Sequence, residues 1–203
     1  MEIKEEGQGR LFKSAFLEKF TKTSPKAAWT LYAIIGSVML VFGFRLNPDI
    51  SILAATGIII SGLFFWTFYE YLHHRYINHL DDYFPESDLA CRIAYTLHGI
   101  HHEYPRDEER VVLPPAAWLL LAGAYTGLFW LAIGPLALLF CPGFLFGYLG
   151  YSMIHALVHK THIPKPLRGL YRHHAIHHYK YPDKAYGVST MFWDRVFRTM
   201  PPE

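Results

Sequence analysis

Cysteine is scarce in this sequence. Only Cys91 and Cys141 occur among the 203 residues, far apart, and neither belongs to a CxxC pair. Disulfide frameworks and thiolate sites for zinc or iron–sulfur clusters need several cysteines at short, regular spacings. The sequence therefore excludes both kinds of site, and we interpret the two cysteines as packing residues.

Charge is also scarce. Asp, Glu, Lys and Arg make up 18% of the residues, against about 25% in typical soluble domains, and the formal net charge is +2. A balance this close to zero, with dispersed basic residues, excludes a nucleic-acid surface. Apolar residues make up 52% and aromatic residues 17% of the chain. This composition favours a membrane protein, and the length suits one domain.

Long stretches without charge mark the expected membrane spans, because a charged side chain at the bilayer centre costs about 2.5–3.5 kcal/mol. Three such stretches cover residues 27–44, 50–69 and 111–159. A crossing needs about 20 residues, so the third stretch is long enough for two, with a turn at Ile133-Gly134-Pro135. The sequence therefore predicts an all-α integral membrane protein with four transmembrane helices, at 27–44, 50–69, 115–133 and 136–156.

The basic residues predict the orientation of these spans. Only Arg45 lies between the first two spans, and the turn between the last two has no Lys or Arg. The positive-inside rule then places both termini and the loop 70–110 in the cytoplasm, at a bacterial inner membrane or the endoplasmic reticulum.

Residues 1–26 are expected to precede the membrane domain of residues 27–203 as a cytosolic segment. They lack the apolar core of a secretory signal, so we expect them to be retained. Phe12, Phe16 and Phe20 recur there at helical spacing. This pattern fits either a helix lying on the cytoplasmic leaflet or a helix packed on the domain.

The 13 histidines are confined to four short stretches, at 73–79, 98–102, 155–162 and 173–178. The predicted topology brings all four stretches to the cytoplasmic side. In three of them the histidines stand three or four positions apart, so on a helix they share one face and can converge. His74 and His79 are five apart, which predicts a bend or an unwound turn between them. The candidate metal ligands are His74, His79, His98, His101, His102, His155, His159, His174, His177 and His178.

This pattern favours metal ligation over ordinary buried histidines, since no histidine lies elsewhere. Neutral imidazole binds iron, zinc, copper and nickel, and ten ligands suit two ions better than one. His73, His162 and His173 break the spacing and are expected around the site. The ligand type alone does not choose between iron, which activates dioxygen, and zinc, which acts as a Lewis acid. A site at the mouth of a helix bundle favours oxidation of a lipid acyl chain, and spans without acids disfavour a metal transporter.

Ordered motifs over residues 60–200 resemble the fatty acid hydroxylase and sterol desaturase superfamily, above all its fatty acid 2-hydroxylase branch. His74 and His79 match HxxxxH, and "HGIHHEYPRDEERVVLPP" follows. His155 and His159 match HxxxH, and "HAIHH" and "GVSTMFWDRVFRT" come last. The resemblance implies a four-span membrane oxidoreductase whose cytosolic cap holds two metal ions on the ten histidines. The metal would be iron, with zinc as the alternative, and no catalytic residue beyond the ligands is implied.

The resemblance also implies the reaction and the partners. Members of the superfamily use dioxygen and two electrons to hydroxylate or desaturate lipids, and this branch hydroxylates carbon 2 of a long-chain fatty acid or sphingolipid acyl group. Residues 1–50 contain no histidine that could bind a haem, so we expect a separate cytochrome b5-like or ferredoxin-like donor. Two alternatives stay open: a sterol or carotenoid hydroxylase or desaturase, because "HALVHKTHIP" is similar to carotene hydroxylases, and a membrane metal-binding protein without redox activity.

Three positions depart from the pattern of the branch. Ser152 stands where the branch has an acid, Lys160 where a second adjacent histidine often follows, and Arg198 where the motif has glycine. The missing acid at Ser152 is expected to alter the hydrogen bonding that orients His155.

Overall fold

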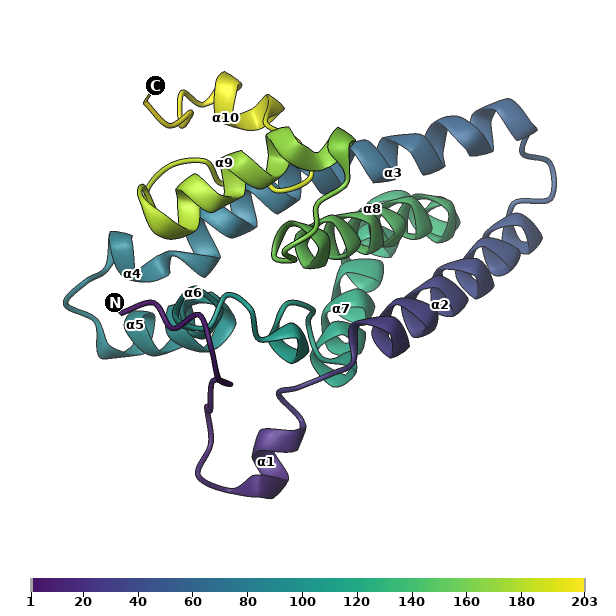
Figure 1. Ribbon diagram of the computed structural model, residues 1–203. Coiled ribbons are helices and arrows are strands. Elements are labelled where there is room, and N and C mark those ends of the chain that lie inside the picture. Colours follow the sequence, from purple (N-terminus) through teal and green to yellow (C-terminus); the bar gives the residue numbers. More distant parts are fainter. Residues whose placement is uncertain (1, 203) are drawn as a thin grey trace.

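The computed structural model describes residues 2–202, and every regular element in them is a helix. Four helices are long: α2 (Pro25–Leu46), α3 (Ile52–His73), α7 (Pro115–Ile133) and α8 (Ala137–Val158). They follow the four predicted spans closely, so the all-α prediction is confirmed. α2 and α3 diverge from the short loop that joins them, and α8 packs against both (Figure 1).

Within residues 2–202, three stretches are long and apolar enough to cross a membrane: Pro25–Leu46, Ile52–Asn78 and Glu108–Val158. The third contains both α7 and α8, joined by the short turn η4 (Gly134–Leu136). Gly134 has a φ of +59°, which glycine adopts without steric cost. The predicted turn is therefore present. The crossing of α7 and α8 as two separate spans, and the cytoplasmic orientation, stay predictions.

α3 and α8 approach so closely that two glycines have no room for a side chain. A Cβ atom on Gly62 of α3 would lie 2.1 Å from the carbonyl oxygen of Phe140. One on Gly143 of α8 would lie 2.0 Å from the carbonyl oxygen of Ile59. Small residues let helices approach where packing rather than the hydrophobic effect drives their association. This contact sets the register between the histidine-bearing ends of α3 and α8.

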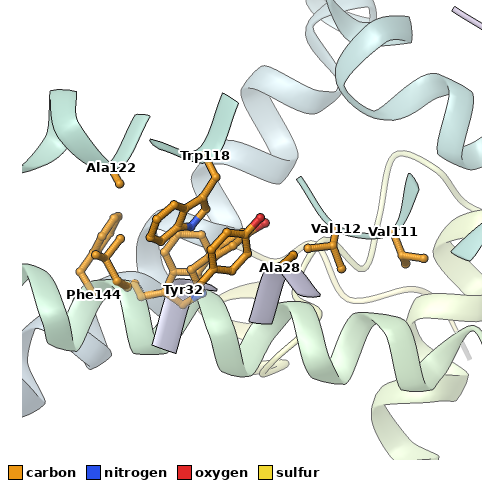
Figure 2. Close-up of a cluster of buried hydrophobic side chains, with 10 residues drawn as sticks. Ala28, Tyr32, Val111, Val112, Trp118, Ala122 and Phe144 are labelled. Carbon is orange, nitrogen blue, oxygen red and sulfur yellow. The ribbon is translucent and has the colours of Figure 1, made fainter. Parts of the chain in front are cut away.

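An aromatic cluster joins α2, α7 and α8. Tyr32 of α2 stacks on Trp118 of α7 with ring centroids 4.1 Å apart, and its ring lies 5.6 Å from that of Tyr148 on α8. Figure 2 shows this stack together with Phe144. The Tyr32 hydroxyl donates to the Leu113 carbonyl, and the Leu113 N–H donates to the Tyr148 hydroxyl at 3.1 Å. The buried hydroxyls thus fix the chain where it enters α7.

Short helices form a cap at the end of the bundle opposite the α2–α3 loop (Figure 1). Between α3 and α7 the chain forms η1 (His74–Asn78), α4 (Leu80–Tyr83), α5 (Asp88–Ala94), η2 (Tyr95–Gly99), α6 (Ile100–Glu103) and η3 (Glu108–Arg110). After α8 it forms η5 (Lys165–Leu167), α9 (Arg168–Tyr179) and α10 (Phe192–Val196). The histidine stretches lie in this cap or at its junction with the long helices.

The N-terminal segment is tied to the cap by Arg110. The guanidinium donates to the Gly9 carbonyl at 2.9 and 3.1 Å and pairs with Glu18. Asp107 accepts a hydrogen bond from the Gly9 N–H at 3.2 Å. Beyond this clamp, α1 (Ala15–Lys19) exposes its apolar residues, and Phe16 is 70% exposed. The placement of residues 1–26 on a membrane surface stays a prediction.

We expect Arg110→Ala to release residues 9–21 from the cap without unfolding the helix bundle. The substitution leaves the buried Asp107 carboxylate without its cation and removes the guanidinium's hydrogen bonds to Gly9, Glu18 and Thr21. Because the freed Glu18 regains water, the cost should be limited to about 1–3 kcal/mol. Hydrogen exchange by mass spectrometry should show faster exchange confined to residues 9–21. Arg106→Ala, at a 53% exposed side chain, is the matched control, and unchanged exchange in Arg110→Ala would contradict the clamp.

Candidate metal centre

The structure gathers the ten predicted histidines into two clusters of five. Within each cluster, every histidine places one ring nitrogen within 4.8 Å of those of the other four. All are buried except His159, which is half-buried. The first histidine cluster is His74, His79, His98, His102 and His177. The second histidine cluster is His101, His155, His159, His174 and His178.

Each of the two HxxHH motifs supplies both clusters. In "HGIHH", His98 and His102 enter the first cluster and His101 the second. In "HAIHH" the assignment is reversed: His174 and His178 enter the second cluster, and His177 the first. At about 100° per residue, positions i and i+4 are separated by about 40°, whereas i+3 lies about 60° to the other side. The expectation that each motif converges on one point is therefore wrong in detail, because the middle histidine of each motif points to the neighbouring cluster.

A π-helical turn accounts for the five-residue spacing of His74 and His79. η1 begins at His74 and ends at Asn78, immediately before His79. In a π-helix the hydrogen bonds join residues five apart, so side chains at i and i+5 come to one face. The predicted distortion between the two histidines is present, as a widened turn rather than an unwound one.

The ring nitrogens in each cluster are spaced like ligands of one ion. The Nε2 atoms of His74 and His98 lie 2.9 Å apart, and those of His79 and His177 lie 3.2 Å apart. In the second histidine cluster, His159 Nε2 lies between 2.9 and 3.2 Å from the Nε2 atoms of three other members. Two nitrogens bound at about 2.1 Å to one metal, about 90° apart, are separated by about 3.0 Å. The geometry therefore fits one ion per cluster.

Three backbone carbonyls set the tautomers of their histidine partners. A carbonyl oxygen can only accept, so the Nδ1 atom facing it carries the proton and Nε2 keeps its lone pair. Such outer hydrogen bonds orient a ligand ring and raise its basicity. The three pairs are His74 Nδ1 with Tyr186 (2.5 Å), His155 Nδ1 with Val111 (3.1 Å) and His177 Nδ1 with Lys184 (2.7 Å).

Burial keeps the cap histidines neutral. Desolvation, followed by repulsion among neighbouring imidazoles, holds the pKa of His98, His101 and His174 well below the usual value. Burial likewise lowers the pKa of His177. Neutral imidazoles have a free lone pair, which is the form that binds a metal.

Buried nitrogens without a protein partner support the same interpretation. Within residues 2–202, His102 Nε2 and both ring nitrogens of His178 have no hydrogen-bond partner. A buried polar atom left unpaired costs about 1–3 kcal/mol. One metal ion in each cluster would bind the free nitrogen lone pairs there. The donor set therefore fits the two ions that the motifs predict.

The remaining histidines lie outside both clusters, as expected. His173 Nε2 is 3.0 Å from Asp194 Oδ2. His73 is half-buried against Tyr69, with ring centroids 5.4 Å apart. His162 is exposed and lies next to Thr161.

Two buried carboxylates, Glu70 and Asp194, hold the C-terminal motif under the clusters. Glu70 accepts hydrogen bonds from the backbone N–H groups of Val188 and Ser189 at 2.9 and 2.8 Å. It also accepts from Trp66 Nε1 at 3.2 Å. The sequence signal for Glu70 is a lone acid at the end of an apolar span, where an uncompensated charge is costly.

Asp194 accepts hydrogen bonds from the backbone N–H groups of Tyr186 (2.9 Å) and Gly187 (2.8 Å). The Thr199 hydroxyl donates to it at 2.8 Å. The segment that carries the Lys184 and Tyr186 carbonyls is therefore anchored by this carboxylate. Through these carbonyls, Asp194 acts on the orientation of two cluster histidines.

Two of the departures from the branch pattern have local partners. Ser152 is buried and donates to the Leu149 carbonyl at 2.9 Å, whereas His155 uses the Val111 carbonyl. Lys160 is exposed and pairs with Glu108. In this chain a backbone carbonyl thus provides the hydrogen bond to His155 Nδ1.

Arg198 is the third departure, and its φ of +58° lies in the left-handed region. Residues with a Cβ atom lose about 1–2 kcal/mol there, a cost that glycine avoids. We expect Arg198→Gly to stabilise the protein by about 0.5–1 kcal/mol, since the greater entropy of unfolded glycine offsets part of the gain. Thermal unfolding in detergent should show a raised Tm. Arg195→Gly, in α10, should lower it, and a lowered Tm in Arg198→Gly would contradict the backbone strain.

A cavity of about 310 Å³ connects the clusters to the long helices. On the cap side its wall includes histidines of both clusters, and toward the bundle it is apolar. The cluster histidines that line it are His74, His98, His101 and His155, and the apolar residues include Trp118, Leu121, Ala122, Phe144 and Leu145. An elongated apolar ligand with one end at the clusters fits this arrangement.

Comparisons with known proteins agree with these observations. A family model described as fatty acid hydroxylase matches residues 59–199. The ceramide very long chain fatty acid hydroxylase SCS7 of Saccharomyces cerevisiae is 36% identical, over 91% of this chain and 47% of its own length. The dihydroceramide fatty acyl 2-hydroxylase FAH2 of Arabidopsis thaliana is 33% identical, over 95% of this chain and 80% of its own length.

A solved structure has the same fold. It is that of full-length scs7p, in which only the hydroxylase domain is visible, and it matches with a TM-score of 0.88 and 32% identity over 97% of this chain and 74% of that chain. The present chain spans about half the length of the yeast relatives it matches. The family model covers most of the chain and includes both histidine clusters, so this protein belongs to the fatty acid hydroxylase family.

Proposed function

We propose that this protein is a membrane-bound di-iron oxygenase that hydroxylates carbon 2 of a long acyl chain, carried by a fatty acid or a sphingolipid. The observation that carries the proposal is the cavity, which joins both histidine clusters to an apolar space among the long helices. A relative at 36% identity is named a ceramide very long chain fatty acid hydroxylase, and relatives at 33% and 30% identity are named dihydroceramide fatty acyl 2-hydroxylase and fatty acid 2-hydroxylase.

In this proposal each cluster holds one metal ion through its five histidines. The carbonyls of Tyr186, Val111 and Lys184 keep three of these rings in the tautomer that presents Nε2. When bound, two iron ions would supply dioxygen activation with two electrons from outside. We expect these electrons to come from a separate cytochrome b5-like or ferredoxin-like protein.

The protein's own contribution is to position the acyl chain and to exclude water. Trp118, Ala122 and Phe144 line the part of the cavity that would hold the tail. His74, His98 and His101 line the part where the oxidised carbon would lie. A chain held with its tail among the long helices presents carbons near its polar end to the clusters, which accounts for oxidation at carbon 2.

The proposed reaction is consistent with one orientation of the protein in the membrane. The substrate would enter sideways from the bilayer, and the clusters and both termini would lie on the cytoplasmic side, where electron donors are available.

Lipid mass spectrometry tests the function. Cells that express the protein should gain acyl chains with one added oxygen at carbon 2, and cells that express His177→Ala should not. Unchanged acyl chains together with an altered sterol or carotenoid would replace the proposal with the related lipid oxidation. No oxygen uptake by purified, iron-loaded and reduced protein would instead indicate a metal-binding protein without redox activity.

A further inference from the structure

Among the polar side chains that line the cavity, His73 and Asn78 form no hydrogen bond with another group of residues 2–202, and both are half-buried. Several other polar groups in the wall are bonded within the protein: the Tyr69 and Tyr125 hydroxyls bond each other, and the Thr96 hydroxyl donates to the Arg92 carbonyl. The Tyr151 hydroxyl, also in the wall, forms no such bond, but its ring stacks on His155 of the second histidine cluster. His73 is not a member of either cluster.

His73 lies between the apolar end of the cavity and the cap. Tyr69 contacts Phe144 and Tyr125, with ring centroids 5.4 and 5.2 Å apart. His73 packs against Tyr69, one helical turn nearer the cap, and Asn78 follows at the end of η1. His74, the neighbour of His73, belongs to the first histidine cluster. A chain with its tail against the apolar wall would thus bring its polar end to His73 and Asn78, beside the first histidine cluster.

We propose that His73, assisted by Asn78, binds the polar group at carbon 1 of the acyl substrate and so sets which carbon faces the clusters. The inference rests on the proposed function and adds a subsite to it. The chemistry recognised is an acyl carbonyl, either the amide of an N-acyl sphingoid base or the carboxylate of a free fatty acid. A ring N–H or an amide N–H donates to this oxygen, which otherwise enters the cavity without a partner.

The role of His73 differs from that of the cluster histidines. Its loss should leave both ions bound, because it contributes no nitrogen to either cluster. The loss of His73 should weaken substrate binding and allow the acyl chain to shift along the cavity, so that other carbons face the clusters. A single neutral hydrogen bond corresponds to a change of about 3- to 10-fold in binding.

The test compares three variants of the full chain, purified with metal and assayed with a reductant and dioxygen. His73→Leu removes the hydrogen-bonding group, His73→Gln keeps a donor and an acceptor, and His162→Leu removes an exposed histidine outside the cavity. N-palmitoyl sphinganine and palmitic acid are the two substrates. The readouts are KM, kcat, metal content and the ratio of 2-hydroxy to 3-hydroxy product.

We expect His73→Leu to raise KM about 3- to 10-fold, to release 3-hydroxy product and to keep both metals, with His73→Gln close to the parent and His162→Leu unchanged. An effect on the sphinganine substrate alone identifies the amide as the bound group, and an effect on both substrates identifies the carbonyl. Unchanged KM and product ratio in a metal-loaded His73→Leu would overturn the inference. If His73→Leu loses metal, Asn78→Leu decides by the same readouts. Failure of the proposed function is distinct, because the parent protein would then form no 2-hydroxy product.

Discussion

His177→Ala is expected to lower the bound metal from two ions to one per chain and to abolish hydroxylation. His177 belongs only to the first histidine cluster, where its Nε2 lies 3.2 Å from that of His79. The loss of metal affinity at the first histidine cluster should exceed the roughly 10- to 100-fold drop that follows when a hydrogen-bond partner of a metal ligand is removed. The second histidine cluster keeps all five members, so one ion should remain. Metal analysis of the purified protein, together with lipid mass spectrometry, measures both effects.

Two further variants make this result specific. His178→Ala should remove the other ion, because His178 belongs to the second histidine cluster. His162→Ala should keep both ions and full activity, since His162 is exposed and lies outside both clusters. The helix bundle should insert normally in all three, because no apolar span is altered. Two ions retained by His177→Ala would refute its role as a ligand.

Asp194→Ala is expected to destabilise the protein and to weaken metal binding although Asp194 lies outside both clusters. The carboxylate is fully buried and accepts hydrogen bonds from the N–H groups of Tyr186 and Gly187. Leaving two buried amides unpaired costs about 2–6 kcal/mol. The same segment carries the carbonyls that orient His74 and His177, so metal affinity should fall about 10- to 100-fold.

Thermal unfolding in detergent and metal titration test this prediction separately. Asp194→Asn keeps one acceptor oxygen and should give an intermediate loss. Asp183→Ala, at a side chain that is 65% exposed in the same part of the chain, should change neither quantity. A destabilised Asp194→Ala that keeps parental metal affinity would show that the carbonyls do not orient the two histidines.

The helices and the histidine set could be predicted from the sequence because both depend on local properties of the chain. The charge-free stretches predicted α2, α3, α7 and α8, and the turn at Gly134 follows from a Gly-Pro pair inside an apolar run. The ten histidines were selected by spacing, and the structure gathers the same ten. Their function as ligands stays a prediction, as does the division of the chain at residue 26.

The sequence by itself determined the helical architecture, the candidate ligands and the family. Hydrophobic patterns, stretches without charged residues and motif spacing can all be recognised in the sequence without knowledge of the fold. Only the tertiary structure decided which histidines share a cluster and what orients them. His74 and Tyr186 are 112 positions apart, and Glu70 and Val188 are 118 apart. Contacts of this kind depend on the packing of α3 on α8 and on the return of the C-terminal segment to α3. No local pattern encodes that arrangement, because each partner is an ordinary backbone group whose position only the complete fold defines.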